Sequence, residues 1–443
     1  MALETDFLEL LESGTPQAFE QFTSDLDENW IYEAIEETGK LTIRKRKILA
    51  SQGVWLVIGM GLFRDRSIVE VMSHLSLVLP RPGEERGSVA SSSISNARGR
   101  IGPEPLKVLF EGTGRKWAHQ AAQDDSWRGL GLYASDGTTF RVQDTEVNRS
   151  TYGSPSGKNG SASYPQLRLV AVLAARSHLI CAVNFGPYQG KQTGEQALMK
   201  PLWDEVPDNS LIIVDKGFFD LGPLYLFQIK RENRHWLVPA KKNTRWKTIK
   251  KFADGDELVE LNLSDDARKK YPGLPSSMRA RAIFYQHGDH EPRWLLTSLV
   301  NPDEYPAQEV IELYHERWEA EIGYDEIKTH MLERKEALRS KSPERVSQEL
   351  WGILIAYNLI RLKMREAASY YNVPANRISF RHSLQLIRIF CLIEAWTTAP
   401  SKLPARLGEL TEMVGLLLLP SRRSERSYER VVKRKPKKYK NAK

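Results

Sequence analysis

The run LIIVD, residues 211–215, is the most apolar strand-like stretch of the chain and decides its fold class. Four consecutive apolar residues predict a strand that is buried on both faces of a sheet covered by helices. The run ends in a carboxylate, Asp215, which Lys216 and Gly217 follow. Because ligands bind at the carboxyl ends of strands in such sheets, Asp215 is a candidate site residue. A cap beside a loop is the alternative interpretation.

Strand and helix patterns alternate on both sides of this run. β-rich segments are bounded by turn residues, and segments with helical spacing lie between them. The expected positions are strands at 132–142, 166–173, 179–185 and 235–239, and helices at 195–204 and 221–230. The resulting order, β-β-β-α-β-α-β, predicts an α/β fold in which helices pack on a mixed sheet.

Residues 1–125 predict a helical N-terminal domain. Apolar residues recur there at helical spacing in four segments, with Gly and Pro between them. These segments are 16–26, 46–62, 67–77 and one from Ser92 to near Gly102. A basic run overlaps the start of the second segment and consists of Arg44, Lys45, Arg46 and Lys47. A small helical domain with such a run is a common DNA-binding design, and a solvated helix start explains the run equally well.

Residues 241–300 interrupt the alternation with a β-rich segment. It opens with a basic stretch whose candidate DNA contacts are Lys241, Lys242, Arg245 and Trp246. Strands are expected after it at 257–261, 278–286 and 293–299. The turn HGDH at 287–290 is expected to join the last two strands as a hairpin, and a metal site in that turn is the less favoured alternative.

Beyond Pro306 the chain predicts long helices at 308–332 and 343–368, followed by a basic tail without apolar pattern. Such a tail is expected to become ordered only when it binds phosphate.

Composition narrows the class of protein. The chain has 443 residues, enough for more than one domain, and 41% are apolar, as in folded globular proteins. Lys plus Arg outnumber Asp plus Glu by 64 to 56, which favours a polyanionic partner without establishing one. The two cysteines, Cys181 and Cys391, predict buried thiols in a reducing compartment and no zinc site. Because neither a signal peptide nor a membrane-spanning run is found, we expect a cytoplasmic protein without a membrane partner.

A second aspartate, Asp136, lies inside the strand-like run ASDGT at 134–138. A charged residue among apolar strand positions costs free energy unless it is paired or binds a cation. Asp-Gly is also a frequent turn, so a loop-proximal cap is again the alternative. Asp136 and Asp215 are also compatible with a sugar-cleaving carboxylate pair, although the basic residues described next fit phosphate better.

The expected helix at 308–332 places four polar side chains on one stripe: Tyr314, Arg317, Glu321 and Lys328. At about 100° per residue, their offsets fall within an arc of roughly 60°. One helix face thus presents a hydroxyl, a guanidinium, a carboxylate and an ammonium group. An ordinary solvated face is the alternative interpretation.

Three carboxylates on a sheet and an adjacent helix, Asp136, Asp215 and Glu321, suit Mg²⁺, for which Mn²⁺ substitutes, because both ions prefer oxygen ligands. Two such ions activate water or a 3′-hydroxyl and stabilise the entering and leaving oxygens of a phosphoryl displacement. Arg317 and Lys328 are expected to hold the phosphate backbone beside them.

The spacing Y-x2-R-x3-E-x6-K, from Tyr314 to Lys328, resembles the signature of DDE transposases of the insertion-sequence-4 type. SDGTTFRVQDT at 135–145 and LIIVDKGFFD at 211–220 are similar to the two Asp regions of that family. RKRKILASQGVWLVIGMGLFRDRSI at 44–68 is similar to its N-terminal domain. The resemblance therefore covers nearly the whole chain.

The resemblance implies an RNase H-like catalytic core with a β-rich insertion between the second Asp and the Glu. By position, Asp136, Asp215 and Glu321 take the metal-ligand roles, and the other three residues of the signature contact transposon-end phosphates. The implied division is a helical DNA-binding domain, the first part of the core, the insertion, the second part of the core with the Glu-bearing helix, and a helical C-terminal region with the tail. The boundaries are 1–125, 126–240, 241–300, 301–370 and 371–443.

The resemblance also implies a cut-and-paste enzyme that binds double-stranded DNA at terminal inverted repeats and at the target, and pairs the ends as a homodimer. Such an enzyme acts at the nucleoid. If the route includes a hairpin, Trp246 or Trp294 is a candidate to stack on a flipped base, although core packing is expected for both and for Trp318. The alternatives are a nuclease of the same fold without strand transfer, and a DNA-binding regulator that no longer cuts.

Overall fold

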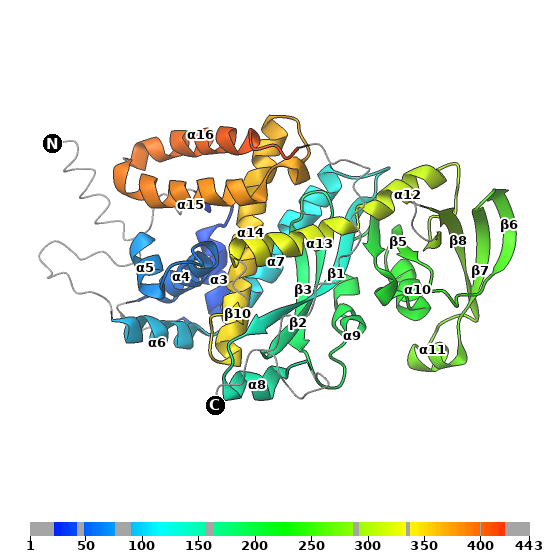
Figure 1. Ribbon diagram of the computed structural model, residues 1–443, viewed down its shortest axis with the longest axis horizontal. Coiled ribbons are helices and arrows are strands. Elements are labelled where there is room, and N and C mark those ends of the chain that lie inside the picture. The colour runs from blue at the N-terminus through cyan, green and yellow to red at the C-terminus, as the bar shows by residue number, and fades with distance from the viewer. Residues whose placement is uncertain are drawn as a thin grey trace, which may run out of the picture.

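The computed structural model describes residues 22–41, 48–75, 90–155, 164–286, 292–333, 337–398 and 400–420. Helices gather at one end of an elongated molecule, and the sheet extends to the other end (Figure 1). The basic run at 44–47, the turn at 287–290 and the basic tail after residue 420 lie outside the described residues.

The central sheet contains both parallel and antiparallel strands. Its five core strands are β1 (Gly131–Val142), β2 (Gln166–Ala174), β3 (Ile180–Pro187), β4 (Ser210–Val214) and β5 (Arg234–Pro239). They lie in the order β3-β2-β1-β4-β5; β2 is antiparallel to both β1 and β3, whereas β1, β4 and β5 are parallel. All five residues of β4 are buried, which confirms the doubly covered strand predicted from LIIVD. The predicted α/β mixed sheet is therefore confirmed.

The strands of the 241–300 segment continue this sheet. β9 (Arg293–Thr297) pairs with β5, and β8 (Ser277–Tyr285), β7 (Asp256–Asn262) and β6 (Lys247–Ala253) follow in that order. β6 was not predicted from the sequence, because its lysines mask the alternation of a strand. β6 lies at the end of the strand path and is almost entirely exposed. Lysines at such an edge discourage pairing with other chains.

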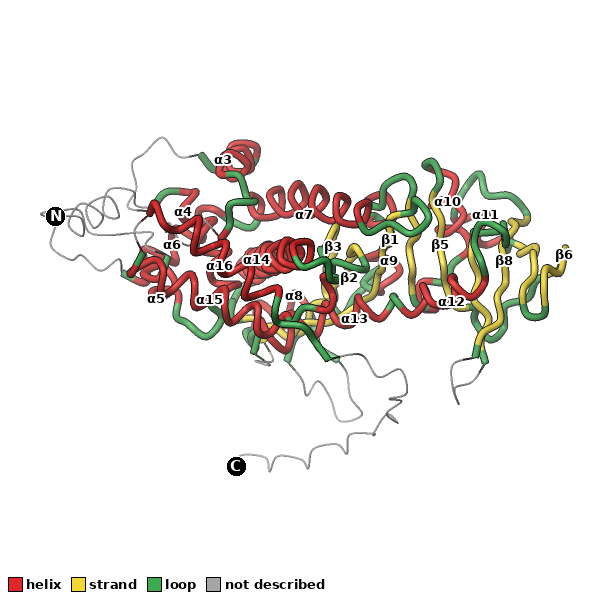
Figure 2. Tube along the Cα trace, turned by 90° about the horizontal axis from the view of Figure 1, so that it is seen from above, coloured by secondary structure: helices red, strands yellow, loops and turns green. Residues whose placement is uncertain are grey.

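Helices cover both faces of the sheet (Figure 2). α7 (Glu104–Asp124) and α10 (Leu221–Lys230) lie on one side, and α12 (Ala307–His315) and α13 (Trp318–Asp325) lie on the other. Side chains of β1 contact helical segments on both faces of the sheet. Ser135 donates to the sulfur of Met199 in α9 (Glu195–Met199), whereas Thr138 accepts from Lys328 beyond α13. Residues one apart in a strand point to opposite faces, so Asp136 faces the α13 side.

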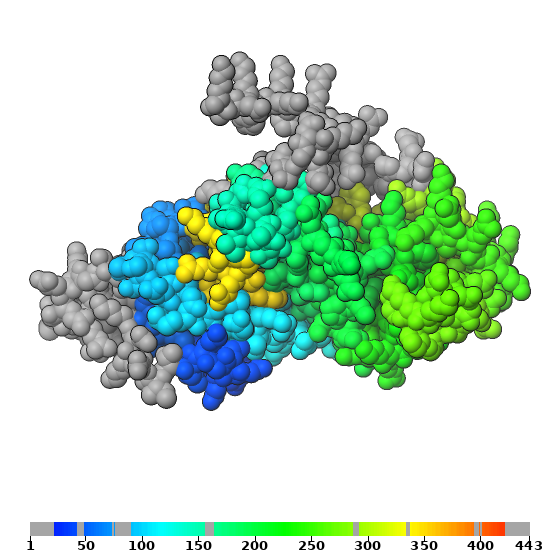
Figure 3. Space-filling model, turned by 90° about the horizontal axis from the view of Figure 1, so that it is seen from below, coloured from blue at the N-terminus to red at the C-terminus, as the bar shows by residue number. Residues whose placement is uncertain are grey.

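The helical end combines segments from both ends of the chain. It contains α3 (Glu28–Glu37), α4 (Ala50–Leu62), α5 (Ile68–His74), α6 (Ser91–Ile101), α14 (Pro343–Tyr370), α15 (Phe380–Thr397) and α16 (Leu403–Gly415). α4 and α14 approach closely at Gly61 and Gly352, where a methyl group added to Gly352 would lie 2.5 Å from the carbonyl oxygen of Val57. In the space-filling view, the residues of α14 emerge between those of the N-terminal helices and the sheet (Figure 3).

Three further differences from the sequence predictions have identifiable local causes. The first helix predicted after β3 ends at Met199 and resumes as a 3₁₀ turn, Leu202–Glu205, because Pro201 has no backbone N–H to continue the helix. A short helix, α8 (Glu146–Tyr152), was missed although Thr145 caps it by accepting from the backbone of Asn148.

The third difference concerns the long helix predicted at 308–332. α12 ends at His315, and the N–H groups of Glu316 and Arg317 bond three residues back, which makes a tighter turn. α13 then follows, and a π-helical turn, Glu326–Met331, succeeds it. Both irregularities change the angular offset between residues, so the single stripe derived for a regular helix does not exist in that form.

None of the described helices is long and apolar enough to cross a membrane. Cys181 and Cys391 are buried free thiols, as the sequence predicted.

Candidate active site

Asp136 lies in the middle of β1, opposite Ala171 of β2. Its Oδ1 accepts a hydrogen bond of 2.7 Å from the backbone N–H of Gly137. Glu195, the first residue of α9, lies over the other face of the strand, where a methyl group added to Gly137 would meet the Glu195 carboxyl carbon at 2.4 Å. Gly137 therefore leaves room for a second carboxylate close to Asp136.

Asp215 follows directly on the last residue of β4. β1 and β4 are parallel neighbours, and Ser135 lies opposite Val214, so the next residue on each strand is an aspartate. The turn after Asp215 is supported from α9, because the Gln196 side chain donates to the carbonyl oxygen of Gly217 at 2.8 Å. The structure therefore brings together the two aspartates that the sequence singled out.

Glu321 lies on α13, with its side chain 50% exposed. Arg317, which precedes the same helix by one residue, holds the Glu321 carboxylate through a hydrogen bond of 2.8 Å from its guanidinium. Arg317 also interacts electrostatically with Asp136 and Asp215. The guanidinium thus lies among all three predicted metal-binding carboxylates.

Tyr314 and Lys328 are less exposed than residues on an open helix face would be. Tyr314 is 4% exposed and packs edge-on against Tyr285 of β8, with ring centroids 5.9 Å apart. The ammonium group of Lys328 donates to Thr138 and lies 5.3 Å from the centre of the Phe140 ring. Thr138 is two residues from Asp136 on the same face of β1, so Lys328 is still a neighbour of the site.

Burial and nearby charge alter the ionisation of these groups. Burial raises the pKa of Asp136 to about 6, and the carboxylates of Glu321 and Glu195 add to the increase, whereas the Gly137 N–H and Arg317 oppose it. Burial also raises the pKa of Tyr314 to about 12. Burial lowers the pKa of Lys328, against the influence of Asp136. Asp136 therefore holds its proton to a higher pH than an ordinary aspartate, and nearby positive charge would favour its ionised form.

Buried polar groups fix α13 to the sheet and to α14. The Tyr324 hydroxyl donates to the Asp136 carbonyl oxygen at 2.6 Å and accepts from the Ala171 N–H at 3.0 Å, so it bridges β1 and β2 at the site itself. On the far side of α13, the His178 imidazole lies 2.6 Å from Oε2 of Glu319. These contacts determine where the helix that carries Glu321 lies relative to Asp136.

A second group of contacts holds the π-helical turn. The carboxylate of Glu326 accepts from the Tyr357 hydroxyl at 2.7 Å and lies 3.5 Å from the Arg361 guanidinium. Arg361 also donates to the carbonyl oxygen of Ser177 at 2.9 Å. Glu326 and Arg361 are both buried, so neither charge has water as an alternative partner. His178 joins this group, because its Nδ1 lies 3.4 Å from Oε2 of Glu326. We refer to Glu326, Tyr357, Arg361 and His178 as the anchor cluster.

The three carboxylates are the type of ligand that divalent metal ions prefer, but their side chains are not arranged as a metal site in this structure. In the described ranges, no three His, Cys, Asp or Glu side chains are close enough to hold a metal ion. The donors are nevertheless oxygen ligands of the kind that Mg²⁺ prefers. Burial raises the pKa of Asp136, and the carboxylates of Glu321 and Glu195 add to the increase; a bound cation would favour the ionised carboxylate, as the Arg317 guanidinium already does in part.

Replacing Asp136 with Asn should stabilise the metal-free protein at pH 8. Its pKa rises from 3.8 to about 6 on folding, so the ionised carboxylate opposes folding above that pH. The stability that Asp136 contributes is fully present below pH 3.8 and is lost as the pH rises through about 6. Thermal unfolding in EDTA should therefore show a higher Tm for the variant at pH 8, and a difference that shrinks toward pH 4. An equal difference at both pH values would contradict the assignment.

The DNA contacts predicted at the start of the 241–300 segment fall into two groups: two of these residues contact other parts of the protein, and two are exposed. Lys241 donates to the Phe219 carbonyl oxygen at 2.8 Å and so braces the segment after Asp215. Trp246 packs edge-on against Trp294 at 5.5 Å and donates to Glu257, which confirms core packing for both tryptophans. Lys242 and Arg245 are exposed. Their contact with DNA stays a prediction.

Trp318 was predicted to pack in the core, and this was wrong. Its side chain is 59% exposed, at the first residue of α13 and one turn from Glu321. The prediction failed because it assumed an uninterrupted helix, whereas the tight turn at Glu316 and Arg317 rotates this residue outward. Glu195 was also missed. Its only signal was a position just after Gly194, at the start of a predicted helix.

Two family models match the chain: "Transposase DDE domain" over residues 127–359 and "Insertion element 4 transposase N-terminal" over residues 16–111. "Transposase InsG for insertion sequence element IS4" of Escherichia coli (strain K12) is 36% identical over 418 residues, 94% of this chain and 92% of that protein. The chain belongs to the insertion element 4 family of DDE transposases. The resemblance stated from the sequence is therefore confirmed, and with it the enzyme class of DNA-cutting and DNA-joining phosphoryl transfer. Membership also implies a general dependence on divalent metal ions.

Other similar proteins are more distant. "Putative transposase InsZ" of Escherichia coli (strain K12) is 32% identical over 56% of this transposase and 76% of that protein. A piggyBac transposase synaptic complex with hairpin DNA, solved by electron cryo-microscopy, aligns with a TM-score of 0.43 at 10% identity, over 92% of this chain and 86% of that one.

Proposed function

We propose that this transposase moves its insertion sequence by a cut-and-paste route, with Asp136, Asp215 and Glu321 as the ligands of two Mg²⁺ ions for which Mn²⁺ substitutes. The observation that carries the proposal is the adjacency of the two aspartates on neighbouring parallel strands, Asp136 within β1 and Asp215 directly after β4, with Arg317 and Glu321 at the start of the facing helix. The ions would activate water or a 3′-hydroxyl and stabilise the oxygens of the displaced phosphate.

The side chains of the chain itself have separate roles. When a metal ion binds the Glu321 carboxylate, the Arg317 guanidinium is released from it and donates to a non-bridging phosphate oxygen instead. Lys328 and Tyr314, the other two polar residues of the signature, position the transposon-end strand through its phosphates. Trp318, exposed beside Glu321, offers an aromatic surface for an unpaired base.

The substrates are double-stranded DNA ends that carry the terminal inverted repeats, and a target duplex. Two protomers pair the ends in a synaptic complex, so that each 3′-hydroxyl attacks the target beside the other. Arg44, Lys45, Arg46 and Lys47, the exposed Lys242 and Arg245, and the basic tail supply further contacts with DNA. The enzyme works at the nucleoid in the cytoplasm, where these duplexes are.

Cleavage of a fragment with the flanking inverted repeats should require Mg²⁺ or Mn²⁺ and should be lost in EDTA and in Asp215→Asn. The amide keeps the shape of Asp215 but removes the charge that a metal ion requires. Gel analysis of end-labelled DNA measures the nick at the repeat boundary, and Asp208→Asn, an exposed loop change, is the matched control. Full cleavage by Asp215→Asn would remove it from the mechanism.

The same assay separates the two rivals. A nuclease without strand transfer would nick the ends but leave a target plasmid unjoined. A DNA-binding regulator would retain the labelled ends without nicking them in either metal. Joined products would exclude both.

A further inference from the structure

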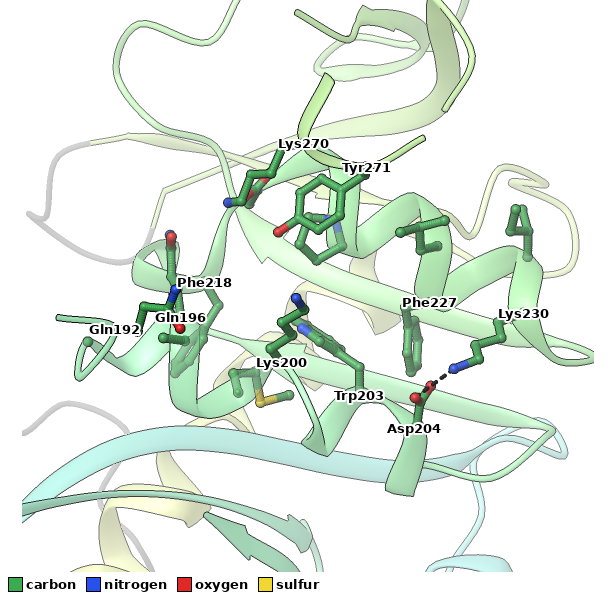
Figure 4. Close-up of a pocket in the computed structure, with 17 residues that line it drawn as sticks. Gln192, Gln196, Lys200, Trp203, Asp204, Phe218, Phe227, Lys230, Lys270 and Tyr271 are labelled. Atoms are coloured by element: carbon green, nitrogen blue, oxygen red, sulfur yellow. Dashed lines mark hydrogen bonds and ion pairs between the residues drawn. The ribbon is translucent and has the colours of Figure 1, made fainter. Parts of the chain in front are cut away.

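A cavity of about 870 Å³ lies between α9, α10 and α11 (Asp265–Lys270), and the proposed reaction does not use it (Figure 4). Drug-sized ligands occupy pockets of roughly 300–1,000 Å³, so the cavity is large enough for one. α9 and α10 cover the face of the sheet opposite α13, and the cavity is therefore separate from the carboxylates of the active site.

Aromatic and apolar side chains form most of the cavity wall. Trp203 and Phe227 pack together at its base with ring centroids 5.3 Å apart. Tyr271 forms the opposite wall and rests on α10 at Gly222, where an added methyl group would meet the Tyr271 ring at 2.7 Å. The glycine lets α11 approach α10, so these walls are preformed and do not need a ligand to assemble them.

Two of the polar groups that face the cavity are hydrogen-bond donors without a described partner. Lys200 forms no ion pair with any described residue, and the Trp203 indole N–H has no acceptor among them. Figure 4 shows both nitrogens directed toward the same part of the cavity, with the Tyr271 hydroxyl on the wall across from them. Lys200 is exposed, so water solvates its ammonium group in the empty cavity, and the phosphate or carboxylate of an anionic ligand would pair with it.

The cavity carries a net positive charge. The two acidic residues that line it are already paired: Asp204 accepts from Lys230 at 2.6 Å, and Asp220 lies 3.6 Å from Lys270. Lys200 is left as the uncompensated charge. An apolar, uncharged ligand would gain nothing from this ammonium group, whereas an anion would form a charge-assisted hydrogen bond with it.

We infer that this cavity binds a nucleotide, with its base against the aromatic wall of Trp203 and Tyr271 and its phosphate at Lys200. Aromatic side chains beside a lysine are the combination by which proteins hold unpaired nucleotides, since every base has a face that stacks and every phosphate a charge that pairs. The nucleotide is either free or the unpaired end of a DNA strand. Only the second source rests on the proposed function.

A bound nucleotide would contact the segment that follows Asp215. Phe218 forms part of the cavity wall, three residues after that aspartate, and its N–H donates to the Asp215 carbonyl oxygen at 2.9 Å. Gln196, also in the wall, donates to Gly217. A ligand in the cavity would therefore contact residues that hold the loop after Asp215 in place.

Calorimetric titration of the full chain in EDTA tests the inference with 2′-deoxyadenosine 5′-monophosphate as the probe. The nucleotide should bind saturably, and Lys200→Ala should weaken the binding about tenfold, as expected for loss of one charge-assisted hydrogen bond. Lys269→Ala removes the same charge from α11 outside the cavity and should change the affinity less than twofold. Deoxyadenosine and inorganic phosphate should each bind more weakly than the nucleotide.

A second variant, Ala197→Trp, fills the cavity from α9 and should abolish binding while thermal unfolding shows that the protein still folds. A duplex with one unpaired 5′-nucleotide, compared with a blunt duplex, identifies the source. Lys200-dependent preference for the overhang with no binding of the monophosphate indicates DNA, and binding of the monophosphate indicates a free nucleotide. If Lys200→Ala and Ala197→Trp both bound the monophosphate and the overhang duplex as tightly as the wild type does, the inference would be overturned. Because metal is absent, that result would leave the cleavage assay and the proposed function untouched.

Discussion

The variant Glu321→Gln should cut transposon ends at least about 10³-fold more slowly than the wild type while binding them with nearly unchanged affinity. The amide keeps the volume of Glu321 but no longer supplies the negative oxygen that a divalent ion requires. A loss of that size corresponds to about 4 kcal/mol of transition-state stabilisation, within what a metal ion contributes to phosphoryl transfer. Binding should persist because most of the affinity comes from phosphate contacts elsewhere.

The structure adds a condition to this expectation. Glu321 is half exposed and its only described ion-pair partner is Arg317. Removing its charge therefore frees the guanidinium for a DNA phosphate, so end binding should be equal or slightly tighter. Single-turnover cleavage and gel-shift titrations at one salt concentration measure the two effects separately, since phosphate contacts make affinity salt-dependent.

Glu312→Gln on α12 is the matched control for that experiment. Glu312 accepts from Gln308 on the helix surface and takes no part in the site. It should cleave at the wild-type rate. Equal rates for Glu321→Gln and the wild type would remove Glu321 from the metal-ligand set, and equal losses in both variants would indicate a general effect of charge.

The sequence was sufficient for the sheet and for the two aspartates. An unbroken apolar run can be buried on both faces only in a covered sheet, and this placed β4 and, at its end, Asp215. Asp136 was found because a carboxylate among apolar strand positions needs a cation or a partner. Local sequence patterns do not predict which strands pair. Only the family resemblance implied that β1 lies beside β4, which puts the two aspartates together.

The segment that carries Glu321 shows where periodicity fails. Helical spacing identified Tyr314 to Lys328 as one helix, but the tight turn after α12 and the π-helical turn after α13 leave no trace in the apolar pattern. Trp318 was misplaced for that reason. The contacts that impose the π turn come from the anchor cluster, whose members lie far apart in the sequence, so no local pattern predicts them.

Replacing Glu326 with Gln should destabilise the protein by roughly 3 kcal/mol, which is the order found when one partner of a buried ion pair is removed. The variant leaves the Arg361 guanidinium buried at 1% exposure without its countercharge, and it weakens the acceptor for the Tyr357 hydroxyl. Thermal unfolding monitored by circular dichroism should show a lower Tm. Glu111→Gln, which breaks an exposed pair with Lys107, should leave the Tm within error of the wild type.

The pH dependence of this loss has a definite sign. Burial alone would raise the pKa of Glu326, but Arg361 and His178 outweigh burial and hold the pKa below the ordinary 4.5. A carboxyl whose pKa falls on folding stabilises the protein above its ordinary pKa, and that stabilisation is lost as the pH falls through the lowered value. The Tm difference between the wild type and Glu326→Gln should therefore be largest near neutral pH and diminish below about pH 4.5.

A double-mutant cycle distinguishes a paired charge from two independent defects. Arg361→Gln alone should also destabilise the protein, because it leaves the Glu326 carboxylate buried, whereas the double variant removes both charges. The two losses should therefore sum to more than the loss measured for the double variant, with a coupling energy of about 1–3 kcal/mol. Strictly additive losses would show that Glu326 and Arg361 do not stabilise each other. Single-turnover cleavage by the folded fraction of Glu326→Gln should fall as well, because the π turn sets the position of Lys328 and continues directly from the helix that carries Glu321.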